Sequence, residues 1–311
     1  MNDSTPVPSP QIISPQLIVL EALQIAHAST GAAQYREVYE QLRHRAGQRH
    51  ASGEGSGSQP SAPTPMTQPS AAQADTSTSS ATAGPARMRV ICATRKDREE
   101  FFSTAPLGRS LTLNRPPGVE VRLFPRNSEG LPALYNRAIS ESIQDDVIFV
   151  FVHDDIHLCD FHWASRIAGG LGAFDVLGLA GNRRRVPGQP GWLFLDERLT
   201  RDSRENLSGV IAHGSGFAPD SIDAFGPAGQ EVKLLDGVLL AVTSATLRAT
   251  SLRFDERFDF HFYDLDFCRQ AERAGLKMGT WPVSVVHESA GNFASAGWRL
   301  SYETYLDKWQ E

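Results

Sequence analysis

The chain has 311 residues, of which 41% are hydrophobic and 21% charged, proportions that are ordinary for a globular protein with one large core. Its formal net charge of −6 provides no general basic surface, which argues against a nucleic-acid-binding protein. Cys92, Cys159 and Cys268 are isolated in the sequence and form neither a disulfide framework nor a CxxC metal site, which indicates a reducing compartment.

The sequence contains no stretch that is typical of a membrane or export segment. No apolar run reaches the length that is needed to span a bilayer, so no transmembrane segment is expected. The N-terminus, MNDSTP, lacks the basic start and the apolar core of a signal peptide. We therefore expect a cytoplasmic protein.

The N-terminal part of the chain is predicted to precede the main domain as separate segments. Residues 1–14 are rich in Pro and Ser and are expected to be disordered. Residues 15–47 carry apolar residues at helical spacing, which predicts a helical hairpin that faintly resembles one tetratricopeptide unit. Because one unit cannot bury its own face, it should dock on the main domain, on a protein partner or on a second copy of the chain. Residues 48–86 have the Ser-, Ala-, Pro- and Gly-rich composition of a disordered linker.

Residues 87–311 are predicted to form one α/β domain. Six segments have the apolar composition of buried strands: 88–94, 119–124, 147–152, 175–181, 234–242 and 277–286. Helical patterns begin near Pro132, Trp163 and Asp264. Strands and helices that alternate at these lengths predict right-handed βαβ units and a mostly parallel central sheet flanked by helices. Residues 182–230 show little periodicity and are expected to form a long functional or mobile loop.

The strand at 147–152 ends abruptly in His153, Asp154 and Asp155. All six residues of this strand are apolar, which is typical of a strand buried on both faces. Ligands of open α/β sheets bind at the carboxyl ends of the strands. An imidazole and two carboxylates at such an end suit a metal ion and a phosphorylated ligand, although the two acids taken alone could merely turn the chain.

Three other segments carry side chains that could complete such a site. Asp236 and Gly237 interrupt a strand pattern, and His287 directly follows the last strand. Asp264 lies in the first turn of a helix, where the dipole favours an anion. Each has a plain structural alternative, since Asp236 can cap a turn and His287 can be a core histidine. Asp264 can likewise be only a helix-terminus acid, with Asp266 as its solvated neighbour.

The order of these motifs resembles an inverting glycosyltransferase of the large family-2 group, with the GT-A fold. More narrowly, it resembles the glycosyltransferase-like branch that contains StrF-type domains. The matching segments are VICATR, EGLPALYNRAI, VIFVFVHDDIHL, FDVLGLAGN, LLDGVLLAV, LRFDERFDFHFYDLDFCRQAERAGLKMG and VVHES. The resemblance implies a Rossmann-like sheet and a hexosyl-transferring enzyme. It would move a sugar from a nucleotide-sugar donor to a glycan or small-molecule acceptor, in bacterial glycan or secondary-metabolite assembly.

The resemblance also implies roles for individual residues. Asp155 and His287 would bind a divalent cation, Mn²⁺ or Mg²⁺, that contacts the donor diphosphate, and Asp264 would be the catalytic base. Trp192, in the long loop, is the best candidate to stack on a sugar face. The residues expected to bind donor or acceptor are Arg95, Asn136, His153, Asp154, Asp236, Gly237 and Trp192.

These residue types suit the chemistry of an inverting transfer. One base takes the proton of the acceptor hydroxyl as its oxygen attacks the anomeric carbon. A divalent cation neutralises the departing diphosphate, and imidazole ligands suit Mn²⁺ better than Mg²⁺. The alternative from a different class is a catalytically inactive GT-A-like module that binds a nucleotide, a glycan or a partner. A metal-dependent hydrolase is a third possibility.

Overall fold

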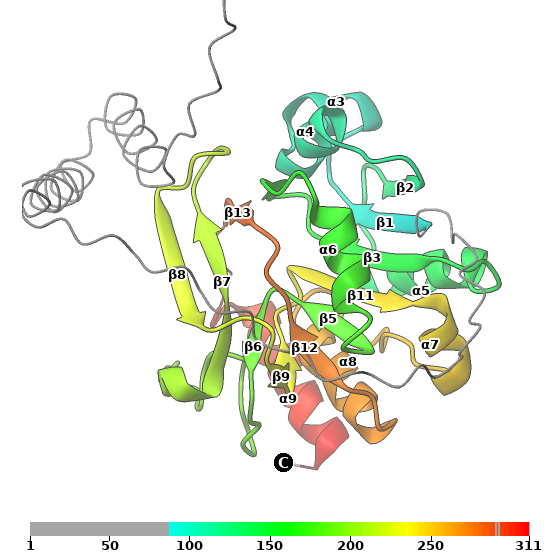
Figure 1. Cartoon of the computed structure of the whole chain (residues 1–311). Coiled ribbons are helices and arrows are strands. Elements are labelled where there is room, and N and C mark those ends of the chain that lie inside the picture. Colours follow the sequence, from blue (N-terminus) through cyan, green and yellow to red (C-terminus); the bar gives the residue numbers. More distant parts are fainter. Residues whose placement is uncertain (1–86, 290, 292, 311) are drawn as a thin grey trace, which may run out of the picture. The chain divides into compact units, whose positions relative to one another are not determined.

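The computed structural model describes residues 87–289, 291 and 293–310 of the chain. The predicted N-terminal segment (1–14), helical hairpin (15–47) and linker (48–86) lie outside the described residues. The described part folds as an α/β domain with two β-sheets flanked by helices (Figure 1). Within this part, each helix is too short or too polar to cross a membrane.

The larger sheet has seven strands in the order β2-β1-β3-β11-β5-β12-β9. Its strands are β1 (Met88–Ala93), β2 (Val119–Phe124), β3 (Ile148–Val152), β5 (Val176–Gly178), β9 (Glu231–Val232), β11 (Leu239–Thr243) and β12 (Met278–Thr280). Parallel pairs join β1 to β2, β1 to β3 and β5 to β12. Strand β11 runs antiparallel to both β3 and β5, and β9 runs antiparallel to β12. Five of the seven strands thus run in one direction, as predicted for a mostly parallel sheet, and only β9 and β11 of this sheet run opposite to them.

The second sheet has the path β10-β6-β7-β13-β4, with β8 paired to β7. Its strands are β4 (Ile156–Leu158), β6 (Ala180–Asn182), β7 (Leu207–His213), β8 (Ser221–Gly226), β10 (Leu234–Leu235) and β13 (Val285–His287). The 3₁₀ turn η1 (Arg204–Asn206) precedes β7. The loop expected at 182–230 thus contains a β-hairpin, β7–β8, which lies along one side of the domain in Figure 1. Only Phe225 is buried in β8, so this strand lacks the apolar run by which a buried strand is recognised.

Three of the predicted strands are each divided between the two sheets. Residues 175–181 form β5 and the start of β6, residues 234–242 form β10 and most of β11, and residues 277–286 form β12 and most of β13. The apolar pattern continues through the links because link residues such as Leu179 and Val238 are buried as well. The links bring the ends of several strands together between the sheets, and the candidate site residues stand at these ends.

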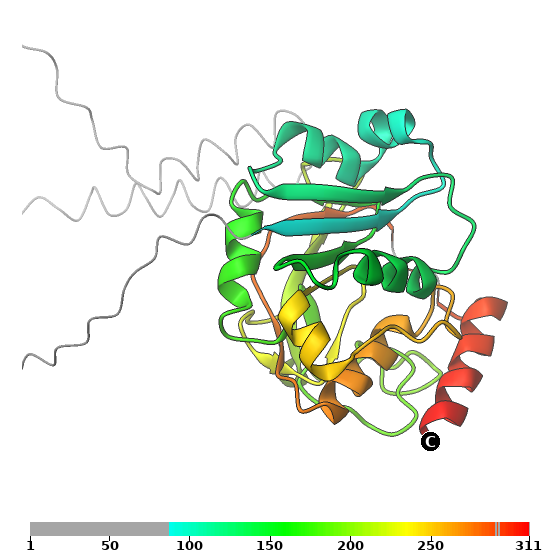
Figure 2. The ribbon, with the colours of Figure 1, turned by 90° about the vertical axis from the view of Figure 1, so that its right-hand side faces the viewer.

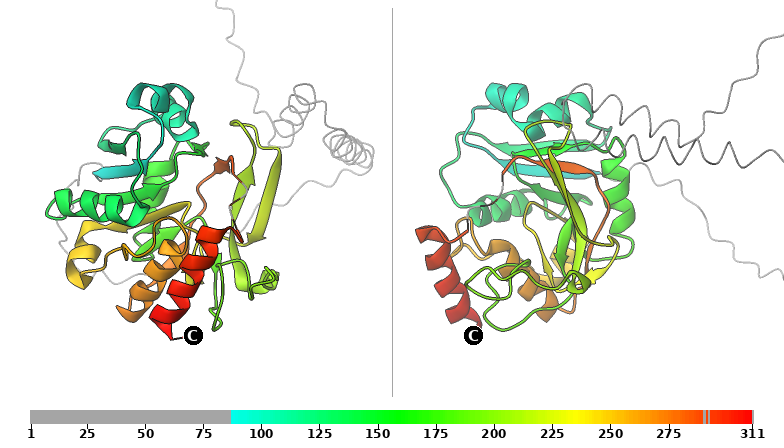
Figure 3. Two further views of the ribbon diagram at one scale, coloured as in Figure 1. Left: turned by 180° about the vertical axis from the view of Figure 1, so that it is seen from behind. Right: turned by 90° about the vertical axis from the view of Figure 1, so that its left-hand side faces the viewer.

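The helices of the described part are α3 (Arg98–Thr104), α4 (Pro106–Leu113), α5 (Leu131–Ser142), α6 (Trp163–Gly170), α7 (Ser244–Thr250), α8 (Tyr263–Arg273) and α9 (Ala296–Trp309). The helices expected near Pro132, Trp163 and Asp264 are confirmed as α5, α6 and α8. Figure 2 shows α3 and α4 together beside the strands of the larger sheet, and Figure 3 shows α9 alongside α8. Helix α8 matters most for the site, because Asp264 lies in its first turn.

A buried charged cluster fastens α9 to α8. Asp266 is fully buried, and its Oδ1 lies 2.6 Å from Nζ of Lys308 and accepts a hydrogen bond from Nε1 of Trp309 at 2.9 Å. The same Lys308 Nζ lies 2.6 Å from Oδ2 of Asp255. The interpretation of Asp266 as a solvated acid is therefore wrong, and its charge instead anchors the C-terminal helix. This contact fixes the helix that carries Asp264.

Candidate active site

A cavity of about 620 Å³ opens where the links between the two sheets meet the start of α8. Strands β7 and β8 line another of its sides through Ile211, Asp223 and Phe225. Seven of the predicted site residues line this cavity: His153, Asp155, Trp192, Asp236, Gly237, Asp264 and His287. Residues more than 130 positions apart in the sequence thus face one space, as the rule for strand ends predicts.

Two imidazoles and one carboxylate form a cluster in this cavity, which we name the His–Asp cluster. Each of His153, Asp155 and His287 offers one ligand atom, and the three atoms lie within 4.8 Å of one another. Oδ2 of Asp155 is 3.3 Å from Nε2 of His287, whereas Oδ1 of Asp155 is buried without a hydrogen-bond partner among the described residues. A buried carboxylate oxygen without a partner is costly unless an ion or water binds it. The residues therefore fit a divalent cation.

The charges in the His–Asp cluster act on one another. Burial disfavours the charged carboxylate of Asp155, but the hydrogen bond and the charge of His287 outweigh it and lower the pKa of Asp155 to about 2. Burial opposes the charged form of His287 as well, and the partner Asp155 raises the pKa of His287 above its usual value. Burial lowers the pKa of His153, which favours the neutral imidazole that a metal ion requires.

Asp264 reaches the cavity from the first turn of α8. Its Oδ2 accepts a hydrogen bond from the backbone N–H of Gly237 at 2.9 Å, and its Oδ1 accepts one from the N–H of Leu265 at 2.9 Å. Burial, and then the charge of Asp236, raise the pKa of Asp264 to about 7 despite these donors. A carboxyl with such a pKa exchanges protons near neutral pH, as a general base must.

Asp236 lies in the link between β10 and β11 and is held at both oxygens. Its Oδ1 accepts a hydrogen bond from the N–H of Val238 at 2.9 Å, and its Oδ2 accepts one from the indole Nε1 of Trp192 at 2.8 Å. The ring of Trp192 packs edge-on against Phe225, with 4.8 Å between centroids. Trp192 is only 8% exposed, and its indole orients Asp236. That it stacks on a sugar face stays a prediction.

Gly237 is required by close packing at this link. A Cβ at this position would lie 2.5 Å from the hydroxyl oxygen of Tyr263 and 2.9 Å from Cβ of Asp264. The link can therefore approach the start of α8 only with glycine at this position.

Three predicted donor-binding residues lie outside the lining of the cavity. Oδ2 of Asp154 accepts a hydrogen bond from the hydroxyl of Thr94 at 2.6 Å, which ties the end of β3 to the end of β1. Asn136 is turned to the segment after α7, where its Nδ2 donates to the carbonyl of Phe254 at 2.8 Å and its Oδ1 accepts from the N–H of Phe254 at 3.0 Å. Arg95 follows β1 and is exposed. Asp154 and Asn136 thus make structural contacts, and their binding of donor or acceptor stays a prediction.

Tyr263 is a cavity residue that the sequence pattern does not single out. It is only 2% exposed and lines the cavity. Its hydroxyl oxygen lies 3.0 Å from Nε2 of His153. Phe260 stacks on the ring of the same histidine, with 5.6 Å between ring centroids. Both belong to the FHFYDLD segment, so their nearness to Asp264 in sequence is the signal that could have identified them.

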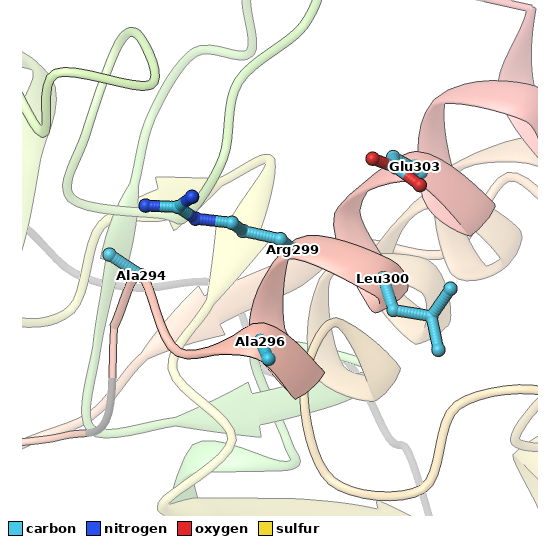
Figure 4. A pocket seen from close by; sticks show the side chains of 5 residues that line it. All are labelled: Ala294, Ala296, Arg299, Leu300 and Glu303. Atoms are coloured by element: carbon cyan, nitrogen blue, oxygen red, sulfur yellow. The ribbon is translucent and has the colours of Figure 1, made fainter.

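A separate hollow of about 480 Å³ lies at the start of α9 (Figure 4). It is lined by Ala294, Ala296, Arg299, Leu300 and Glu303. Because it contains none of the predicted site residues and is lined by only two charged side chains, it offers no set of groups for catalysis.

The match to a protein-family profile, and not the fold alone, gives the class of protein. Residues 91–290 match the profile of the glycosyltransferase-like family, and the chain belongs to this family. The family that the sequence predicts is thereby confirmed. Among curated proteins, no sequence matches the chain.

Two solved structures resemble the chain at low sequence identity. The crystal structure of TarS from S. aureus is 14% identical, with a TM-score of 0.41, over 66% of this chain and 37% of TarS. The crystal structure of GalNAc-T7 with UDP, GalNAc and Mn²⁺ is 9% identical, with a TM-score of 0.46, over 71% of this chain and 48% of GalNAc-T7. The chain thus spans less than half the length of either protein.

Proposed function

We propose that this protein transfers a sugar from a nucleotide-sugar donor to an acceptor hydroxyl with inversion, assisted by a divalent cation. One observation carries the proposal: the carboxylate suited to be the base, Asp264, lines the same cavity as the His–Asp cluster. An inverting transfer requires both functions around one anomeric carbon. The alternative roles of these residues, as helix cap and core histidine, do not require a shared cavity.

Asp155, His287 and His153 would hold the cation. Bound there, a divalent cation would neutralise the negative charge of the departing nucleoside diphosphate. The two imidazole nitrogens favour Mn²⁺ over Mg²⁺, which prefers oxygen ligands.

Asp264 would accept the proton of the acceptor hydroxyl. Two backbone N–H groups hold its carboxylate in place, so that little reorientation is needed when the acceptor oxygen attacks. Asp236, with both oxygens already held, would contact a hydroxyl of the sugar or the acceptor and keep the pKa of Asp264 high. The acceptor would be a glycan or a small molecule, in bacterial glycan or secondary-metabolite assembly, as the resemblance to the StrF-containing branch suggests. Docking of the N-terminal hairpin and a cytoplasmic location stay predictions from the sequence.

The experiment compares Asp264→Asn with the wild-type protein in a transfer assay over a panel of nucleotide-sugars and acceptors. We expect the substitution to lower transfer by about 10²–10⁴-fold while nucleoside diphosphate binding is retained. Asp154→Asn is the matched control, since Asp154 is an acid at the end of β3 that does not line the cavity. Equal transfer by Asp264→Asn would overturn the base assignment.

The same assay separates the alternatives. A wild-type protein that binds nucleotides and transfers nothing to any acceptor would support the binding module. Release of free sugar without an acceptor would support the hydrolase.

A further inference from the structure

The hydroxyl of Tyr263 lies between a carbonyl and an imidazole. It donates a hydrogen bond to the backbone oxygen of Gly237 at 2.8 Å, and it lies 3.0 Å from Nε2 of His153. Tyr263 is 2% exposed, so water is not freely available to replace either partner. The one proton and the lone pairs of this oxygen must therefore serve both contacts, together with the neighbouring buried hydroxyl of Tyr135.

The available donors and acceptors decide the direction of both hydrogen bonds, the one to Gly237 and the one to His153. A backbone carbonyl can only accept, so the single hydroxyl proton of Tyr263 must point to Gly237. If that proton pointed to His153 instead, the buried carbonyl of Gly237 would face the phenol oxygen with no proton between them. The tyrosine oxygen is consequently an acceptor toward His153, and Nε2 of the imidazole must carry the hydrogen.

We infer that Tyr263 is a positioning residue that fixes the tautomer of His153, with the proton on Nε2, and thereby leaves Nδ1 as the nitrogen that binds the cation. A neutral imidazole has only one nitrogen with a free lone pair, and the hydrogen bond at the other nitrogen determines which one it is. The inference rests on the proposed metal-assisted function. It assigns a role to His153 and to Tyr263, the residue next to the proposed base.

Two further contacts hold His153 in place, one at its backbone and one at its ring. The backbone N–H of His153 donates to the carbonyl of Val238 at 3.1 Å, and Phe260 stacks on the ring. The backbone that supplies the acceptor for Tyr263 belongs to Gly237, whose N–H also holds Asp264. One residue of the β10–β11 link thus connects the proposed base with the proposed metal ligand.

The start of α8 is held in place from the other side. Phe262, directly before Tyr263, has a φ of +66°, which is costly for a bulky residue. Its ring packs against Trp298, Tyr302 and Tyr305 of α9, at 5.3–5.4 Å between centroids. The packing of α9 therefore holds the backbone turn that aims the Tyr263 hydroxyl at His153.

The first test is the tautomer itself, read in the full-length, metal-free protein. Protein with ¹⁵N-labelled histidine is treated with EDTA, and two-bond ¹H–¹⁵N correlation spectra report which ring nitrogen carries the proton. The signals of His153 are assigned by their loss in His153→Gln. We expect the Nε2–H pattern for His153, and an Nδ1–H pattern would overturn the inference.

The second test measures Mn²⁺ affinity by calorimetry for the wild type, Tyr263→Phe and Tyr302→Phe. Removal of the Tyr263 hydroxyl should weaken Mn²⁺ binding by about 10–100-fold. Tyr302→Phe is the matched control, because it keeps the ring that packs on Phe262 and deletes only a hydroxyl. That hydroxyl also donates to a glycine carbonyl, that of Gly188 at 2.5 Å, and Tyr302 is not part of the His–Asp cluster. Equal Mn²⁺ affinity of Tyr263→Phe and the wild type would overturn the inference.

The two tests distinguish this inference from the proposed function. If the wild type binds no Mn²⁺, the metal-assisted function fails, and the inferred role of the tautomer fails with it. If the wild type binds Mn²⁺ and His153 carries its proton on Nδ1, only the inference fails. Should Tyr263→Phe not fold, the spectrum of the wild type still decides.

Discussion

Nε1 of Trp192 donates a hydrogen bond to Oδ2 of Asp236 at 2.8 Å, which ties the loop after β6 to the link between β10 and β11. Trp192→Phe keeps an aromatic ring against Phe225 and removes only the donor. A buried carboxylate oxygen that loses a partner costs about 1–3 kcal/mol. Because Asp236 lines the cavity, we expect kcat for sugar transfer to fall roughly tenfold.

The matched control is Trp281→Phe, since Trp281 packs on Phe174 and does not line the cavity. A transfer rate that falls equally in both variants would show that Trp192 acts only through packing.

The pKa of Asp264 predicts the pH dependence of transfer. A base works in its deprotonated form, so kcat/KM should rise with pH through about 7 and level off above it. The charge of Asp236 is one cause of the raised pKa of Asp264. In Asp236→Asn this charge is absent, so the midpoint of the rise should move to lower pH.

The midpoint, and not the rate, is the readout of this experiment. The amide of Asp236→Asn has a single acceptor oxygen and can keep only one of the two hydrogen bonds that the carboxylate accepts, so the rate will change for this reason as well. Asp223→Asn, which removes another acid of the cavity lining, should leave the midpoint in place. A midpoint that stays fixed or rises in Asp236→Asn would contradict the account.

Lys308 should be a main determinant of the stability of the domain. Its ammonium neutralises Asp266, which is fully buried, and Asp255. Lys308→Met leaves a buried acid without its counter-charge, which typically costs about 3–5 kcal/mol of the free energy of unfolding. Urea denaturation measures this difference.

Two further variants check the mechanism of this loss. Lys96→Met removes an exposed ion pair with Glu100 and should have little effect. Asp266→Asn in the Lys308→Met background should restore part of the stability, because it removes the uncompensated charge. A double variant that is no more stable than Lys308→Met would contradict this explanation.

The effect of Gly237→Ala tests the close packing at the β10–β11 link. The new methyl group would collide with the hydroxyl of Tyr263 and with Cβ of Asp264. Both the Mn²⁺ affinity and the transfer rate should therefore fall by about tenfold or more, as when a group that orients a metal ligand is lost. Gly169→Ala in α6 is the control, since a Cβ there meets no atom within 4 Å. Wild-type Mn²⁺ binding by Gly237→Ala would show that the turn can relax.

The sequence indicates which polar residues line one cavity better than it predicts how the strands divide into sheets. Asp155, Asp236 and His287 follow or interrupt apolar runs, and polar residues at strand ends meet at one edge of a sheet. Asp264 is indicated instead by its place in the first turn of a helix. The sequence does not reveal that three of the apolar runs are divided between two sheets. A buried link residue such as Leu179 has the same apolar character as a strand residue. Periodicity alone cannot place such a break.

Contacts between side chains are the part that the sequence could not supply. Asn136 and Asp154 lie on segments that the resemblance places near the nucleotide, but their hydrogen-bond partners are Phe254 and Thr94, distant in the sequence. The role of Tyr263 depends on three atoms from three segments. The local sequence around a tyrosine at the start of a helix does not indicate which distant atoms its hydroxyl will contact.

The central claim is that one cavity binds a cation and a nucleoside diphosphate together. The most direct measurement is calorimetric titration of UDP, GDP, ADP and dTDP into the full-length protein, with and without Mn²⁺, for the wild type and Asp155→Asn. We predict that at least one nucleotide binds the wild type much more tightly with Mn²⁺ than without it, and that Asp155→Asn loses this difference. Nucleotide binding that is the same with and without Mn²⁺, or a Mn²⁺ effect that survives in Asp155→Asn, would contradict the account.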